Sequence, residues 1–235
     1  DIRLRYRCSV LGPFWLTLST ALMIGSMGVI YATLFHMDVK EYMGFLALSL
    51  VLWGFMNSMV TEACTAYTSV EGSIRSMRMP YSLYAASNVV RNLVVLAHNL
   101  VVVVVVYLVL WMAPGWDLLL ALPGMLVWLA DGVAVGLLLG PLCARFRDIP
   151  PIIGSLMQMG FFISAVIWKP SQLGGQEWML AFNPLYTVLE IVRAPLLGLV
   201  PSPAVYASAL LTSAVLCGAS WMVFVRVRGR IAFWV

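Results

Sequence analysis

Residues 145–168 read RFRDIPPIIGSLMQMGFFISAVIW, and residues 169–198 continue as KPSQLGGQEWMLAFNPLYTVLEIVRAPLLG. A charged cluster, residues 145–148, stands directly before an apolar run that ends at Trp168. A polar, glycine-rich break follows, and then a second apolar segment that is too short and too interrupted to cross a bilayer. One membrane span followed by a partly inserted hairpin is a channel-like arrangement, and the rest of the chain can be interpreted around it.

The composition excludes a soluble protein. Of the 235 residues, 62% are hydrophobic and only 10% are charged, and the mean hydropathy is +0.95. Soluble chains carry about 25% charged residues. Apolar blocks fill nearly the whole length, so we expect a single membrane domain over residues 1–235. The net charge of +4 could suggest nucleic acid, but in a membrane protein the location of the charges matters more than their sum, and we expect no nucleic-acid partner.

The apolar blocks predict an all-α membrane protein with six spans. A hydrocarbon core of about 30 Å needs roughly 20 helical residues. Six segments satisfy this length approximately, although the fifth is short and the second is polar at its end. The predicted spans are 13–35, 43–66, 89–112, 119–143, 152–168 and 204–225.

The basic residues set the orientation of these spans. If the N-terminus is cytoplasmic, 11 of the 14 Lys and Arg residues fall on the inside and 3 on the outside. The inside residues are Arg3, Arg5, Arg7, Arg75, Arg78, Arg91, Arg145, Arg147, Arg226, Arg228 and Arg230, and the outside residues are Lys40, Lys169 and Arg193. Because basic residues accumulate in cytoplasmic loops, both termini are predicted to be cytoplasmic.

Two loops are long enough to carry structure of their own. In the inner loop 67–88, three charged residues stand at helical spacing ahead of Pro80, which predicts a short helix. In the outer loop 169–203, the pair Asn183-Pro184 begins a helix-like stretch that Pro195 interrupts. An apolar helix of about a dozen residues does not cross a bilayer, so a re-entrant or interfacial hairpin is expected over residues 176–200.

Several of these segments together resemble a known family. Residues 6–15, YRCSVLGPFW, are followed by YATLF at 31–35. Further marks are Arg78-Met79-Pro80, Arg145-Phe146-Arg147-Asp148-Ile149, and Asn183-Pro184 with Arg193. In this combination and order, which covers almost the whole chain, the sequence resembles the permease subunits of polysaccharide ABC exporters. These are ABC-2 type proteins that export O-antigen, capsule and teichoic acid chains.

The resemblance implies an ABC-2 exporter architecture, of the type V-like kind, in the bacterial inner membrane. It implies a homodimer that conducts a lipid-linked polysaccharide and docks separate ATPase subunits. This chain has no G-x-x-x-x-G-K-[ST] phosphate loop, so ATP and Mg²⁺ are expected in the partner and no cofactor in this chain. In one place the sequence departs from the family, which commonly has a Thr-Pro pair late in the fifth span, where this chain has Ser164-Ala165.

The resemblance also implies that the inner loops couple the permease to the ATPase, with the 67–88 loop as the main contact. The candidate coupling residues are Glu71, Arg75, Arg78, Arg145, Arg147 and Asp148. The alternative is that these arginines only set the topology. For the cluster at 145–148, the residues favour a structural role, in which an Arg–Asp pair anchors the inner end of the fifth span.

Aromatic side chains are the candidates for lining a conduit. A sugar polymer presents hydroxyl groups and apolar C–H faces, and flat rings stack on those faces without requiring one sugar sequence. The candidates are Tyr31, Phe35, Trp53, Phe161, Phe162 and Trp168. The alternative is structural, because Trp and Tyr gather at bilayer interfaces and Phe packs between helices.

Two ionisable residues fall inside predicted spans. Asp131 lies roughly 20 Å from the inner end of the fourth span, and His98 lies about 15 Å into the third. Neighbouring antiparallel helices would place them at similar depth, so we expect a structural pair. The alternative is a proton relay, because acids inside a membrane are costly and are usually either paired or functional.

The outer hairpin carries its own charged pair. Glu190 and Arg193 are three residues apart, so they can pair along one helix face. By resemblance this hairpin, with Asn183 and Pro184 at its start, forms a gate at the outer mouth. The alternative is an ordinary interfacial helix. In the fourth span, glycines at 132, 136 and 140 form a smooth face for close helix packing.

No arrangement typical of a catalytic or metal site stands out, and the cysteines lack metal-ligand spacing, so the chain is not expected to be an enzyme. The function expected is export of lipid-linked, O-antigen-like polysaccharide. One alternative is an ABC-2 permease for another lipid or drug. The other is a proton-coupled secondary transporter built around Asp131 and His98, which would require internal repeats that are not evident.

Overall fold

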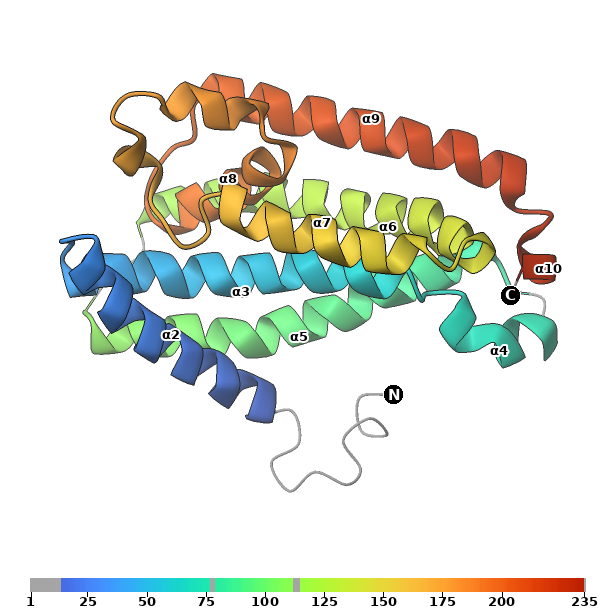
Figure 1. Cartoon of the computed structure of the whole chain (residues 1–235), viewed down its shortest axis with the longest axis horizontal. Coiled ribbons are helices and arrows are strands. Elements are labelled where there is room, and N and C mark those ends of the chain that lie inside the picture. Colours follow the sequence, from blue (N-terminus) through green and yellow to red (C-terminus); the bar gives the residue numbers. More distant parts are fainter. Residues whose placement is uncertain (1–13, 77–78, 112–114, 235) are drawn as a thin grey trace. The chain divides into compact units, whose positions relative to one another are not determined.

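The computed structural model describes residues 14–76, 79–111 and 115–234, and every regular element in those ranges is helical. The α-helices are α2 (Phe14–Leu34), α3 (Val39–Ala63), α4 (Glu71–Ser76), α5 (Tyr81–Val109), α6 (Ala121–Arg145), α7 (Ile149–Ile163), α8 (Pro184–Leu196), α9 (Pro203–Val227) and α10 (Ile231–Trp234). The 3₁₀ segments are η1 (Thr68–Val70), η2 (Trp116–Leu120), η3 (Pro170–Leu173) and η4 (Glu177–Phe182). Figure 1 labels the α-helices along the chain.

Four helices are long and apolar enough to cross a membrane. They are Val39–Ala63, Tyr81–Val109, Trp116–Arg145 and Pro203–Val227. The prediction of an all-α membrane protein is therefore confirmed for the described residues. The first and fifth predicted spans coincide with shorter apolar helices, Leu18–Leu34 and Ile149–Ile163, so the count of six spans stays a prediction.

Helix boundaries differ from the prediction at several places. The helix at the third predicted span begins at Tyr81 rather than at residue 89, which shortens the loop before it. The short helix expected in that loop is present as α4. The fifth helix ends at Ile163 rather than 168. Pro195 does not interrupt α8, because it stands in the last turn of a helix that continues to Leu196.

The chain divides into two compact units. One comprises the described parts of Asp1–Leu52 and Val94–Ala113, and the other the described parts of Trp53–Leu93 and Pro114–Val235. Helices α3 and α5 therefore contribute residues to both units.

Aromatic rings join α2 to the first part of α3 in the first unit. Tyr31 and Phe35 stack with ring centroids 5.7 Å apart. Phe35 in turn meets the edge of Tyr42 at 6.0 Å, and Tyr42 lies 6.4 Å from Phe45. Tyr42 is fully buried. This chain of rings accounts for the spacing of Tyr31 and Phe35 by packing within the unit.

The second unit is built around α6, which packs along α9 and against α8 (Figure 1). Ser220 on α9 donates a hydrogen bond of 2.7 Å to the carbonyl oxygen of Ala134. The indole of Trp128 donates one of 2.7 Å to the carbonyl oxygen of Val188 in α8. Both bonds are buried, so α6 fixes its two neighbours through backbone acceptors as well as through apolar packing.

The glycines of α6 allow three close approaches, as the sequence predicts. A Cβ atom at Gly136 would lie 2.9 Å from the Cβ and 3.2 Å from the Cα of Ala85 in α5. One at Gly132 would meet the thioether of Met59 at 2.7 Å, and one at Gly140 would meet the ring of Tyr67 at 2.8 Å. The face of small residues is therefore used for packing inside this unit.

We expect Gly136→Ala to lower the free energy of unfolding by about 1–3 kcal/mol, because the new methyl group overlaps a backbone atom that cannot rotate away. The matched control is Gly218→Ala in α9, where a Cβ atom meets nothing within 4 Å. Unfolding of both variants in mixed detergent micelles would measure the difference. Equal stabilities would show that the α5–α6 contact is not tight.

Candidate functional site

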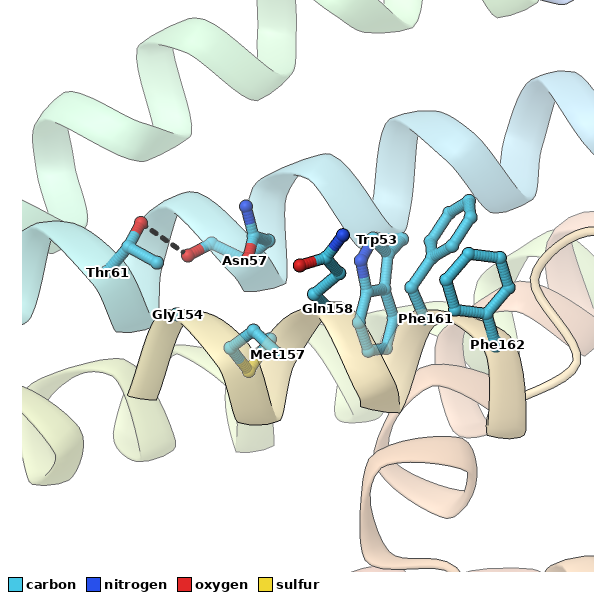
Figure 2. Close-up of a pocket in the computed structure, with 8 residues that line it drawn as sticks. All are labelled: Trp53, Asn57, Thr61, Gly154, Met157, Gln158, Phe161 and Phe162. Atoms are coloured by element: carbon cyan, nitrogen blue, oxygen red, sulfur yellow. Dashed lines mark hydrogen bonds between the residues drawn. The ribbon is translucent and has the colours of Figure 1, made fainter. Parts of the chain in front are cut away.

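Two helix faces enclose a groove in the second unit. Its α3 side is formed by Trp53, Asn57 and Thr61, each four residues from the next and hence on one face. Its α7 side is formed by five residues at the spacing i, i+3, i+4, i+7 and i+8, which also share a face. The groove has a volume of about 440 Å³ and is lined by Trp53, Asn57, Thr61, Gly154, Met157, Gln158, Phe161 and Phe162 (Figure 2).

The groove changes character along its length. Figure 2 shows Thr61 and Asn57 at one end, Phe161 and Phe162 at the other, and Gln158 between them. At the aromatic end, Trp53 meets the ring of Phe161 at 6.0 Å, and Phe161 meets that of Phe162 at 5.3 Å. Asn57 and Thr61 at the other end, with Gln158 in the middle, supply both donors and acceptors.

This arrangement suits a ligand that is both flat-faced and rich in hydroxyl groups. Aromatic rings present apolar faces on which C–H groups can stack. Amides of Asn and Gln can donate to one hydroxyl group and accept from another. All eight described lining residues are uncharged, so the groove contains no strong point charge that would hold one ligand tightly.

Three of the six predicted aromatic candidates therefore line one groove: Trp53, Phe161 and Phe162. Trp168 does not line it, because its indole N–H donates a 2.9 Å hydrogen bond to the carbonyl oxygen of Phe162. Tyr31 and Phe35 belong to the first unit. Their exposure to a conduit remains a prediction.

Sequence reasoning missed the polar members of the groove. Asn57, Thr61 and Gln158 were not among the candidates, although each shares a helix face with a predicted aromatic residue. The signal that could have found them is this spacing, because uncharged polar side chains four residues from Trp53 or three from Phe161 must point the same way.

The aromatic end of the groove lies where α7 stops short. The helix has 15 residues, so it is about 22 Å long, less than the roughly 30 Å of a hydrocarbon core. Its last carbonyl groups have no partners within the helix. At Ala165 the backbone has a φ of 51°, in the left-handed region that β-carbon residues rarely adopt.

Three side chains satisfy those carbonyl groups. Trp168 donates to the carbonyl of Phe162. Asn183 donates its amide N–H groups to the carbonyl of Ile163 and to the hydroxyl of Ser164, each at 3.1 Å. Arg193 donates to the carbonyl of Ala165 at 2.6 Å. The early end of α7 is possible because Trp168 and two residues of the α8 region replace its missing donors.

Asn183 also begins α8. Its side-chain oxygen accepts hydrogen bonds from the backbone N–H groups of Leu185 at 3.0 Å and Tyr186 at 3.2 Å. Pro184 occupies the first helical position, where its missing N–H costs nothing. The helix start predicted from Asn183-Pro184 is confirmed.

Arg193 is completely buried, with 0% of its surface exposed. Its Nε atom donates to Glu190 Oε2 at 2.8 Å, and its Nη2 atom donates to the same oxygen. The guanidinium carbon also lies 5.8 Å from the ring centre of Tyr186. The predicted pairing of Glu190 with Arg193 is present. Burial, and then the Glu190 carboxylate, raise the pKa of Tyr186 well above its ordinary value, so its phenol stays neutral.

Asp131 and His98 each have a partner of their own. Asp131 is 7% exposed and accepts a 2.7 Å hydrogen bond from Ser213 on α9. Nδ1 of His98 lies 2.7 Å from the carbonyl oxygen of Val94 on its own helix. The predicted pairing of these two residues stays a prediction.

A second polar cluster, which sequence reasoning also missed, joins the last turns of α3 to the first part of α5. Arg91 donates to Glu62 Oε2 at 2.7 and 3.1 Å and to the side-chain oxygen of Asn88 at 3.0 Å. Asn92 donates to the same Glu62 oxygen at 3.0 Å. Asn88 reaches the carbonyl of Met59 at 3.3 Å. This cluster fixes the two helices on either side of the loop that carries α4.

The predicted coupling residues lie in or beside the two loops that are expected to be cytoplasmic, one after α3 and one after α6. Glu71 begins α4 and is exposed, and Arg75 belongs to the same helix. Arg78 lies outside the described residues. Arg147 and Asp148 are exposed between α6 and α7.

Arg145, at the end of α6, contacts two aromatic rings. Its guanidinium lies 5.3 Å from the ring centre of Trp234 in α10 and 5.7 Å from that of Phe146. Among the described residues, the ion pairs include none between Arg145 or Arg147 and Asp148. The expected Arg–Asp anchor is therefore replaced by cation–π contacts, which the sequence could not indicate because Trp234 is distant in the chain.

Helix α10 also packs against residues on both sides of the loop between α3 and α5. Ile231 is fully buried in an apolar cluster with Tyr67 and Tyr84. The hydroxyl of Tyr67 donates to the carbonyl of Tyr81 at 3.3 Å, and burial raises the pKa of Tyr67 well above its ordinary value. Helix α10 therefore contacts residues next to both loops that carry the coupling candidates, the loop after α3 and the loop after α6.

Residues 1–197 match the family described as ABC-2 type transporter. The chain belongs to this family. Its helices thus form the membrane-embedded permease of an ABC-2 transporter.

Relatives carry a consistent description. The O-antigen export system permease protein RfbA of Myxococcus xanthus is 25% identical over 201 residues, covering 83% of this chain and 76% of that protein. A protein of the same description from Klebsiella pneumoniae is 21% identical over 194 residues, covering 80% of this chain and 74% of that protein.

We expect Asp131→Asn to preserve transport by this permease. The amide oxygen of Asn can still accept from Ser213, and no charge then has to be held away from water. The measurements are the amount of protein in the membrane and the transport rate with and without a proton gradient. Loss of transport at normal protein level would instead support a proton relay through Asp131.

Proposed function

We propose that this protein is the conduit-forming subunit of an ATP-driven exporter that moves a lipid-linked, O-antigen-like polysaccharide across the bacterial inner membrane. The observation that carries the proposal is the uncharged groove between α3 and α7, with aromatic rings at one end and amides at the other. The descriptions of the relatives from Myxococcus xanthus and Klebsiella pneumoniae support the substrate class.

The groove matches the requirements of a moving sugar chain. A polymer must slide, so each contact has to be weak and repeated rather than a single tight site. Stacking on aromatic rings and exchangeable hydrogen bonds to amides meet this requirement. A wholly apolar lipid or drug would leave the amides of Asn57 and Gln158 without partners, which disfavours the alternative of a lipid or drug permease.

In this proposal the chain crosses the membrane six times, with both termini cytoplasmic. Two copies form the conduit, and each docks one ATPase subunit, which binds ATP and Mg²⁺. Closure of the ATPase dimer pushes on α4 and on the loop at 145–148. The polar cluster of Glu62 with Arg91 transmits this push, because it joins α3 and α5 on both sides of α4. The groove residues Trp53, Asn57 and Thr61 lie on α3, the same helix as Glu62, so the movement reaches them along this helix.

The outer part of the proposal concerns α8. This helix and the preceding η4 form a hairpin at the outer mouth, under which the glycan leaves. The hairpin is held by the buried Arg193 and by Asn183, both of which contact the end of α7. The glycan-facing groove and the outer hairpin are therefore joined through α7.

The decisive experiment is co-purification with the ATPase encoded by a neighbouring gene. ATP hydrolysis by the reconstituted complex is measured with and without lipid-linked glycans extracted from the source cells. We expect hydrolysis to rise with the glycan. If no ATPase associates with the protein, or if hydrolysis is indifferent to every glycan fraction, the proposed function is wrong.

We expect Gly154→Leu to block export by filling the groove. A Cβ atom at Gly154 meets nothing within 4 Å, so the larger side chain enters the cavity without displacing the backbone. Export should fall at least several-fold while the amount of protein in the membrane is unchanged. Gly218→Leu in α9 is the matched control, since a Cβ atom there also meets nothing within 4 Å, and it should export normally.

A further inference from the structure

Side chains from outside α7 donate hydrogen bonds to the end of this helix and to the turn that follows it. Most of these bonds come from two residues of the α8 region. Asn183 donates to the carbonyl of Ile163 and to Ser164. Arg193 donates to the carbonyl of Ala165, the residue with the left-handed backbone. Asn183 and Arg193 stand at opposite ends of α8. Both ends of this helix are thus attached to the same short turn.

The turn adjoins the aromatic end of the groove. Gly160 lies one residue before Phe161, and a Cβ atom there would fall 2.5 Å from the side chain of Leu185 in α8 and 3.1 Å from the indole of Trp53. Helix α7 is therefore packed between α8 and the groove residue Trp53 with no spare space at Gly160. The end of α7 therefore cannot move closer to α8 or to Trp53 at this point, and the next residue, Phe161, contacts the ring of Trp53.

We propose that Asn183 and Arg193 are positioning residues that clamp the end of α7 and thereby set the spacing of the three aromatic rings in the groove. The rings are those of Trp53, Phe161 and Phe162. Their contact with a glycan rests on the proposed function, whereas the clamp itself does not. Movement of α8 during transport then widens or narrows the aromatic end directly.

The contacts of Arg193 depend on one another. Its guanidinium is buried, and its hydrogen bonds to Glu190 and to the Ala165 carbonyl are charge-assisted. Releasing them one at a time would leave a buried carbonyl or a buried charge without a partner, which is unfavourable. The bonds of Arg193 to Glu190 and to the Ala165 carbonyl are therefore made together or broken together.

Two conservative variants separate clamping from other roles. Asn183→Ser keeps a residue that is as good an N-cap for α8 but is too short to reach Ile163. Arg193→Lys keeps the positive charge but replaces the forked group, so it cannot bond Glu190 and the Ala165 carbonyl in the same way. The matched control is Trp128→Phe, which removes the 2.7 Å bond from α6 to the backbone of α8 and does not involve α7.

The readout is the ¹⁹F NMR spectrum of the full chain labelled with 5-fluorotryptophan in lipid nanodiscs. The Trp53 resonance is assigned as the signal lost in Trp53→Phe. We expect Asn183→Ser and Arg193→Lys to shift or broaden this resonance, and to raise the glycan concentration needed for half-maximal ATPase stimulation several-fold. Trp128→Phe should leave the Trp53 resonance in place.

An unchanged Trp53 resonance in both variants would overturn the clamp. An equal change in Trp128→Phe would also overturn it, because general anchoring of α8 would then explain the effect. If the Trp53 resonance responds as expected but no glycan stimulates hydrolysis in the wild-type complex, the clamp stands and the proposed function fails. The two ideas can therefore be judged separately.

Discussion

Helix α7 ends before it could cross a hydrocarbon core, and its last carbonyl groups must find donors outside the helix. Trp168, Asn183 and Arg193 supply them, acting on Phe162, Ile163 and Ala165 respectively. Without these side chains, an end at Ile163 would leave several polar groups unpartnered in an apolar setting, at a cost of several kcal/mol each. The packing of α8 on the end of α7 and the buried pair of Glu190 and Arg193 both serve this one requirement.

The same requirement explains why an arginine can be completely buried. A guanidinium without partners would be very unfavourable there, and breaking such a pair typically costs about 3–5 kcal/mol. Arg193 meets a carboxylate, a backbone carbonyl and an aromatic face, so its charge and its donors are used. At the end of α6 the opposite solution is found. Arg145 is exposed and lies over the rings of Phe146 and Trp234, where a cation is stabilised without being desolvated.

Much of the architecture was predictable because it depends on local chemistry. Apolar length predicted the four helices that are long and apolar enough to cross a membrane, Asn183-Pro184 predicted the start of α8, and the separation of Glu190 and Arg193 predicted their pairing. The groove was predicted only in its aromatic half. Asn57, Thr61 and Gln158 were missed, since their spacing from Trp53 or Phe161 shows which helix face they share but not that the faces of α3 and α7 meet. The end of the fifth helix was placed too late for a related reason, because Val166 and Ile167 are as apolar as the residues before them.

The sequence by itself determined that this is a helical membrane protein, which segments are apolar enough to enter the bilayer, and which family it belongs to. These properties depend on hydropathy, helix capping and residue spacing, all of which act over a few residues. Only the tertiary structure decided where α7 stops, which side chains face one another across the groove, and that Arg91 meets Glu62 and Asp131 meets Ser213. Each of these pairs joins residues 29 or more positions apart. Their partnership depends on how whole helices pack, which no local pattern specifies.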